Sequence, residues 1–93
     1  MERIEATVTG KVQMVMFRDF TQRKAKRLGL VGEVQNCSDG SVCVVAEGEH
    51  KQLEKLLKKL HTGPLLARVD EVKSEWLPAT HEFTTFSLIS GKK

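Results

Sequence analysis

The hydrophobic spacing of this 93-residue chain changes period several times, and that succession limits the fold more than any other feature. Residues 49–61 carry leucines at positions i, i+3, i+4 and i+7 among charged and amide side chains, which predicts an amphipathic helix. An earlier helix is predicted over residues 17–28, closed by Gly29, because glycine readily adopts the left-handed conformation after a helix end. Residues 4–9 instead alternate between apolar and polar side chains, which is typical of a half-buried strand.

A β-hairpin is predicted in the middle of the chain, where residues 31–37 and 41–48 are rich in β-branched side chains and flank a short polar turn. If Gly40 takes the left-handed position of a three-residue turn, Val34 lies opposite Val44. This register gathers the hairpin valines on one face, so we expect that face to meet the core.

Two further strands are expected after the second helix, over residues 67–77 and 83–89. The first should contain a bulge, because Asp70 and Glu71 interrupt its alternation. The order strand, helix, strand, strand, helix, strand is that of the ferredoxin-like arrangement. We therefore predict a single α+β domain over residues 1–93, an antiparallel sheet with both helices on one face.

Charge and composition narrow the classes of partner. The formal net charge is +3, but cations and carboxylates are interspersed, so no basic block predicts a nucleic-acid partner. The longest apolar runs are only a few residues, so no membrane association is expected. Residues 1–16 show no secretory leader pattern, which favours a cytoplasmic protein.

Neither cysteine nor histidine spacing indicates a metal site. Cys37 and Cys43 do not form a zinc-binding pair, and the predicted hairpin places them diagonally across the two strands, so we expect two reduced thiols. His50, His61 and His81 show no spacing typical of metal ligands. No cofactor and no metal are expected.

The segment with the clearest chemical content is residues 10–18, between a predicted strand and a predicted helix. A helix N-terminus presents unpaired N–H groups and a partial positive charge, so it can hold an anion. Arg18, in the first turn, would add a planar fork suited to phosphate oxygens. A plain strand-to-helix connection with a solvated arginine explains the segment equally well from the residues alone.

The run GKVQMVMFR in this segment resembles the acylphosphatase signature Gly-x-Val-Gln-Gly-Val-x-Phe-Arg. Further matches follow in the order of that family along nearly the whole chain. They include Asn36, Asp39-Gly40 and Gly63-Pro64. The combination of the loop with a downstream Asn before Asp-Gly is far more specific than either half.

The resemblance implies a hydrolase that cleaves the carboxyl–phosphate bond of small acyl phosphates, without metal or covalent intermediate. Arg18 would bind the phosphate and Asn36 would orient the attacking water. The backbone amides assigned to the phosphate in this way are those of Gln13, Met14, Val15, Met16 and Phe17. Inorganic phosphate or sulfate would compete for the site, and the small size favours a monomer.

Two positions depart from the family pattern, and three alternatives stay open. Met14 stands where the signature has glycine, and Glu33 where the family usually has an aromatic side chain. A non-catalytic phosphate-binding module of the same fold would tolerate Met14. An Asn before a turn, such as Asn36, often only caps the backbone. An RNA-binding domain shares the element order but needs aromatic residues on its central strands, and these strands have none.

Overall fold

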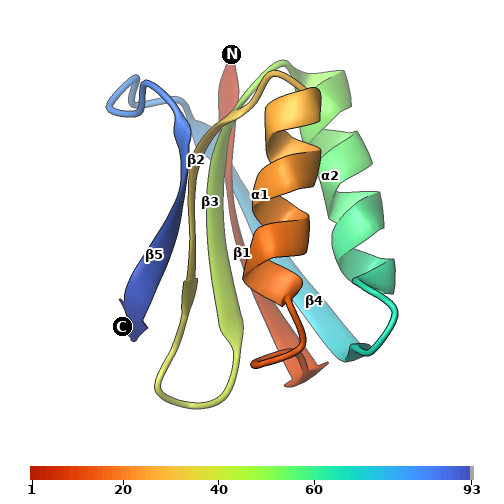
Figure 1. The fold of residues 1–93 in the computed structure, drawn as a ribbon. Helices are drawn as coiled ribbons and strands as arrows, with labels where there is room; N and C mark the ends of the chain where they lie inside the picture. The colour runs from red at the N-terminus through yellow and green to blue at the C-terminus, as the bar shows by residue number, and fades with distance from the viewer. Residues whose placement is uncertain (93) are drawn as a thin grey trace.

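The computed structural model describes residues 1–92 as two layers, a five-stranded sheet with two helices on one face (Figure 1). The elements are β1 (Glu2–Lys11), α1 (Phe17–Arg27), β2 (Val31–Asn36), β3 (Val42–Gly48), α2 (His50–Thr62), β4 (Arg68–Pro78) and β5 (Phe86–Lys92). The ferredoxin-like α+β fold is confirmed. Neither helix in this part of the chain is long and apolar enough to cross a membrane.

The strand order is β4-β1-β3-β2-β5, and every neighbouring pair is antiparallel except β2 and β5, which are parallel. The prediction of a wholly antiparallel sheet is therefore wrong at this edge. The reason is topological. Strand β4 ends at the end of the sheet where β2 begins, so the strand that follows starts there and runs in the direction of β2 (Figure 1).

The predicted register of the hairpin is confirmed, with Val34 opposite Val44 and Gly40 at a positive φ of 93°. The predicted bulge in β4 is present as well. Thr9 of β1 faces Glu71, whereas the next residue, Gly10, faces Val69. A residue with a side chain does not fit at Gly10, because its Cβ would lie 2.1 Å from the carbonyl oxygen of Arg68.

The core lies between the sheet and the helices and is formed by the apolar positions that the two periodicities predict. The strands contribute Ile4, Ala6, Val8, Val34, Val42, Val44 and Phe86, and the helices contribute Phe17, Ala25, Leu53, Leu56 and Leu60. Leu57, the remaining leucine of the stripe, is half-buried and packs against this cluster. Burial of one such side chain stabilises the fold by roughly 1.5–3 kcal/mol.

The turn of the hairpin is closed by a disulfide between Cys37 and Cys43, so the prediction of two separate thiols is wrong. Cys43 faces Gln35 across the ladder, which places Cys37 diagonally, as expected. Diagonal neighbours are commonly roughly 7–8 Å apart. Here the two Cα atoms are 6.3 Å apart, within the range that a disulfide spans.

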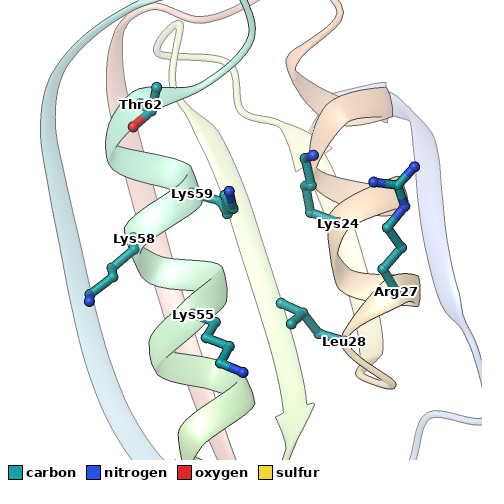
Figure 2. Close-up of a pocket in the computed structure, with 7 residues that line it drawn as sticks. All are labelled: Lys24, Arg27, Leu28, Lys55, Lys58, Lys59 and Thr62. Atoms are coloured by element: carbon teal, nitrogen blue, oxygen red, sulfur yellow. The ribbon is translucent and has the colours of Figure 1, made fainter.

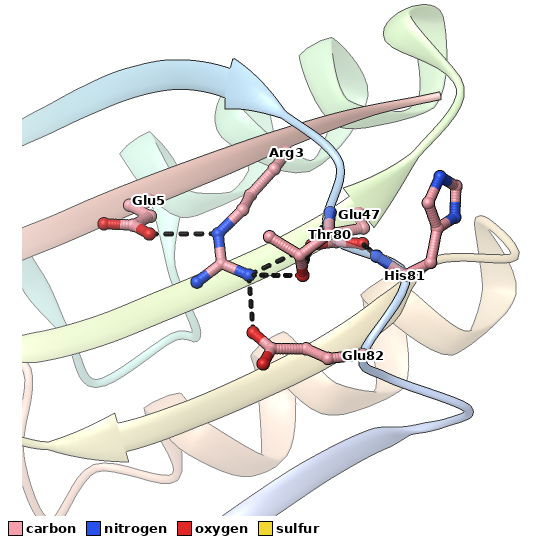
Figure 3. Close-up of polar contacts among 6 residues, drawn as sticks. All are labelled: Arg3, Glu5, Glu47, Thr80, His81 and Glu82. Atoms are coloured by element: carbon pink, nitrogen blue, oxygen red, sulfur yellow. Dashed lines mark hydrogen bonds and ion pairs between the residues drawn. The ribbon is translucent and has the colours of Figure 1, made fainter.

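The end of the sheet where β1 begins is held by a buried carboxylate, Glu47 (Figure 3). Its oxygens accept hydrogen bonds from Arg3 Nη1 at 3.0 Å, from the backbone N–H and hydroxyl of Thr80 at 3.0 and 2.8 Å, and from the N–H of His81 at 2.9 Å. Burial alone raises the pKa of the Glu47 carboxyl, but these hydrogen bonds outweigh it and lower the pKa to about 2. The connection between β4 and β5 is thereby fixed to β1 and β3.

Candidate active site

The loop over residues 12–16 joins β1 to α1 at the other end of the sheet, and buried and exposed side chains are interleaved along it. Val12 and Val15 are buried and attach the loop to the core. Met14 and Met16 are exposed and have φ values of 60° and 65°, in the left-handed region. The conformation that a glycine in the signature would favour is therefore present here with a methionine.

The backbone of this loop offers unpaired donors. Within the described residues, the N–H groups of Gln13 to Met16 donate to no backbone or side-chain acceptor. Helix α1 follows with Met16 as its N-cap and has no side-chain cap, so its first N–H groups are also available. Successive N–H groups in such a turn form a concavity that binds anions, and the helix dipole favours a negative charge there.

Arg18 reaches from the first turn of α1 to the edge of the sheet. Its Nη1 donates to the carbonyl oxygen of Ile89 at 2.7 Å and approaches that of Ser90 at 3.5 Å. Both carbonyls belong to β5, the strand beside β2. This contact occupies one amino group of the guanidinium, and Nε and Nη2 have no partner within residues 1–92.

Asn36 is the last residue of β2, and its side chain faces the core side of the sheet. The residue is 7% exposed, and its Oδ1 has no hydrogen-bond partner among the described residues. Leaving a buried polar atom unpaired costs about 1–3 kcal/mol. An acceptor kept at that cost is well suited to receive a hydrogen bond from a water molecule or a ligand.

The side chain of Gln13 joins the loop to the hairpin that carries Asn36. Its Nε2 donates to the carbonyl oxygens of Cys37 at 2.8 Å and Ser41 at 2.9 Å. The sequence predicted a role only for the Gln13 backbone amide and gave no signal for this bridge. The loop, Asn36 and, through β5, Arg18 therefore lie at the same end of the sheet.

Comparison with known proteins identifies this arrangement. A family model described as acylphosphatase matches residues 4–88. The chain belongs to the acylphosphatase family. It is 51% identical over 86 residues to an acylphosphatase of Marinobacter nauticus, covering 92% of this chain and 94% of the relative. An acylphosphatase of Salinibacter ruber is 47% identical over 85 residues, covering 91% and 90%.

The fold agrees with that assignment. The crystal structure of an acylphosphatase from Bacillus subtilis superimposes with a TM-score of 0.93 at 29% identity, covering 97% of this chain and all of the other. The protein is an acylphosphatase, an enzyme that hydrolyses the carboxyl–phosphate bond of acyl phosphates. A non-catalytic module is not favoured.

Glu33, the second departure from the family pattern, lies away from the loop residues. Burial alternates along β2, so the half-buried Glu33 and the buried Asn36 face opposite sides of the sheet, as the alternation predicts. In the described part of the chain, no three His, Cys, Asp or Glu side chains gather into a group that could hold a metal ion.

A groove of about 430 Å³ lies between α1 and α2, but it contains none of the candidate residues (Figure 2). Its lining consists of Lys24, Arg27, Leu28, Lys55, Lys58, Lys59 and Thr62. Figure 2 shows Leu28 pointing into the gap and the ammonium group of Lys58 turned away from α1. The groove carries five cationic side chains but lies on the helix layer, apart from the loop and Asn36, and we assign it no part in the reaction.

Proposed function

We propose that the loop amides of residues 13–17 and Arg18 hold the phosphate of an acyl phosphate, while Asn36 orients the attacking water. The observation that carries this proposal is the buried Oδ1 of Asn36, which has no hydrogen-bond partner among residues 1–92. It lies at the sheet end that also presents an uncapped helix N-terminus and the guanidinium of Arg18.

The reaction needs few groups. Water attacks phosphorus in line with the bond to the carboxyl oxygen, a new P–O bond forms, and the carboxylate leaves with the electron pair of the broken bond. The carboxylate is a weak base, so no general acid is required, and the proton of the water leaves with the phosphate product. Phosphoryl transfer depends mainly on positioning and charge stabilisation, which the amides, Arg18 and Asn36 supply without metal or covalent intermediate.

The experiment that tests this proposal is hydrolysis of benzoyl phosphate with a chelator present, by the wild type, Arg18→Ala and Asn36→Ala. Removing one preorganised group of this kind lowers kcat by about 10²–10³-fold. Arg23→Ala is the matched control, because Arg23 is an exposed arginine of α1 whose ion-pair partner among residues 1–92 is Asp19. Wild-type turnover in either site variant, with folding checked by circular dichroism, would contradict the assigned roles.

Three further properties belong to this proposal. Inorganic phosphate and sulfate should inhibit competitively, because the amides and Arg18 recognise the anion rather than the acyl group. The protein should sediment as a monomer. Its location should be cytoplasmic, which cell fractionation tests. A thiol assay on the recovered protein would show whether the Cys37–Cys43 bond is closed there, since cytosolic thiols are normally kept reduced.

A further inference from the structure

Most of the exposed large hydrophobic side chains of this molecule are found at one end. Among the described residues these exposed side chains are Met1, Met14, Met16, Leu65, Leu66 and Trp76. Met14 and Met16 belong to the loop that carries the proposed phosphate-binding amides. Leu65 and Leu66 lie in the connection between α2 and β4, and we call these four side chains the apolar rim.

The connection that carries the two leucines is fixed beside the loop at both of its ends. At its start, a Cβ on Gly63 would lie 2.7 Å from Cε2 of Phe17, the first residue of α1. At its finish, Arg68 pairs with Lys11, the last residue of β1. The loop and the connection are therefore neighbours, at the same end of the sheet (Figure 1).

The local backbone turns the rim outward. The N–H of Ala67 donates to the carbonyl oxygen of Pro64 at 3.0 Å, so Leu65 and Leu66 are the two central residues of a tight turn. Leu65 is 96% exposed and Met14 is 98% exposed. Neither side chain contributes to the core.

Exposed apolar side chains gathered in one place mark a binding surface rather than a packing requirement. Met14 shows this most clearly, because a side chain at a left-handed position costs about 1–2 kcal/mol relative to glycine. Methionine is also flexible and polarisable, so it adapts to apolar ligands of different shape.

We infer that the apolar rim binds the acyl group of the substrate, so that this enzyme prefers acyl phosphates with an apolar acyl chain of several carbons. The inference rests on the proposed function. Only one bridging oxygen separates the phosphorus from the acyl carbon, so a phosphate held by the amides of residues 13–17 leaves its acyl group at the border of the loop. The side chains that border the loop on the side of the α2–β4 connection are those of the rim.

The test compares kcat/KM for acetyl, butyryl and hexanoyl phosphate in the wild type and two paired variants. Each methylene that the rim removes from water should raise the wild-type kcat/KM by about two- to fourfold. M14Q/M16Q keeps side-chain length but makes it polar, and should lower the hexanoyl-to-acetyl ratio at least threefold. Met1→Gln is the matched control, since Met1 is an exposed methionine at the opposite end of β1.

L65Q/L66Q is the second variant, because it does not alter the loop backbone and separates loss of apolar contact from distortion of the amides. It should lower the same ratio. An unchanged ratio in both variants would overturn the inference. So would an effect confined to sedimentation or to binding of phosphatidylcholine vesicles, which would assign the rim to a second copy or to a lipid surface.

The two proposals fail separately. A wild type that hydrolyses all three substrates equally, and loses activity in Arg18→Ala, would remove the acyl-binding rim and leave the proposed function standing. Retained activity in Arg18→Ala and Asn36→Ala would instead remove the assigned roles, whatever the acyl preference.

Discussion

Met14 holds a backbone conformation that its side chain disfavours. The family signature has glycine at this position, a residue that readily takes a positive φ, and Met14 has a φ of 60° here. Met16 has the same conformation at a variable position of the signature, where no residue type indicates it. The buried side chains of Val12 and Val15 fix the backbone of the loop. The left-handed conformation of the two methionines therefore depends on these neighbours, and the propensity of methionine itself does not predict it.

We expect Met14→Gly to raise the free energy of unfolding by about 1 kcal/mol. Relief of the left-handed conformation contributes about 1–2 kcal/mol, and the greater freedom of glycine in the unfolded chain offsets part of it. Urea denaturation measures the difference. Lys73→Gly, at an exposed position of β4, should instead lower the free energy of unfolding. A Met14→Gly protein no more stable than the wild type would show that the loop carries no strain at this residue.

At the scale of the elements, the sequence predicts what local periodicity determines. The helix stripes, the hairpin register and the bulge near Asp70 depend on residues close in sequence, and the structure confirms them. The parallel pairing of β5 with β2 depends on which edge of the sheet the last strand reaches, and spacing carries no information on that. The Cys37–Cys43 bond likewise depends on a small difference in the Cα–Cα distance of diagonal neighbours, which the residue pattern does not determine.

The bridge from Gln13 to the hairpin joins two segments that are far apart in the sequence, so local periodicity does not predict it. Its two hydrogen bonds position the loop against the strand end that carries Asn36. We expect Gln13→Met, which keeps the shape and removes the donor, to lower kcat/KM for benzoyl phosphate about tenfold. It should also cost about 1–3 kcal/mol of stability, because two hydrogen bonds are lost, although each carbonyl oxygen keeps a backbone N–H donor.

Gln22→Met is the matched control for that variant. Gln22 is also an amide that donates to a backbone carbonyl, that of Phe86, but the bond lies away from the loop. Both variants should lose stability in urea denaturation, and only Gln13→Met should lose affinity for inorganic phosphate and catalytic efficiency. Equal kinetic losses in the two variants would assign Gln13 a purely structural role.

At the scale of the whole molecule, the two ends of the sheet differ in whether their polar groups have hydrogen-bond partners. The end with the loop has polar groups without partners in the described part of the chain, namely the loop amides and Asn36 Oδ1. The end with Glu47 pairs its buried carboxylate fully, with Arg3, Thr80 and His81. Unpaired groups suit a ligand and paired groups suit stability, so we expect changes at the Glu47 end to alter folding and to leave turnover by folded protein unchanged.

The Glu47 network also predicts how stability depends on pH. The pKa of Glu47 is lowered from its ordinary value of 4.5 to about 2 in the folded protein. Burial, the largest single effect, raises this pKa, but the hydrogen bonds to the carboxylate together outweigh it. A lowered folded pKa stabilises the protein fully above the unfolded pKa, and this contribution is lost as pH falls from about 4.5 through about 2. Glu47→Gln should therefore be less stable by roughly 2–4 kcal/mol at pH 7, because its amide cannot accept from all four donor groups.

The deficit of Glu47→Gln should shrink as pH is lowered through that interval, because the wild-type carboxylate becomes protonated and loses the same interactions. Urea denaturation at pH 7, 4 and 2.5 measures this convergence. Glu75→Gln, a carboxylate on the exposed strand β4 with no ion pair in the described part of the chain, should follow the wild type at every pH. Parallel pH profiles for Glu47→Gln and the wild type would mean that the carboxylate is not held ionised by its partners, and that the buried network is stabilised by packing rather than by charge.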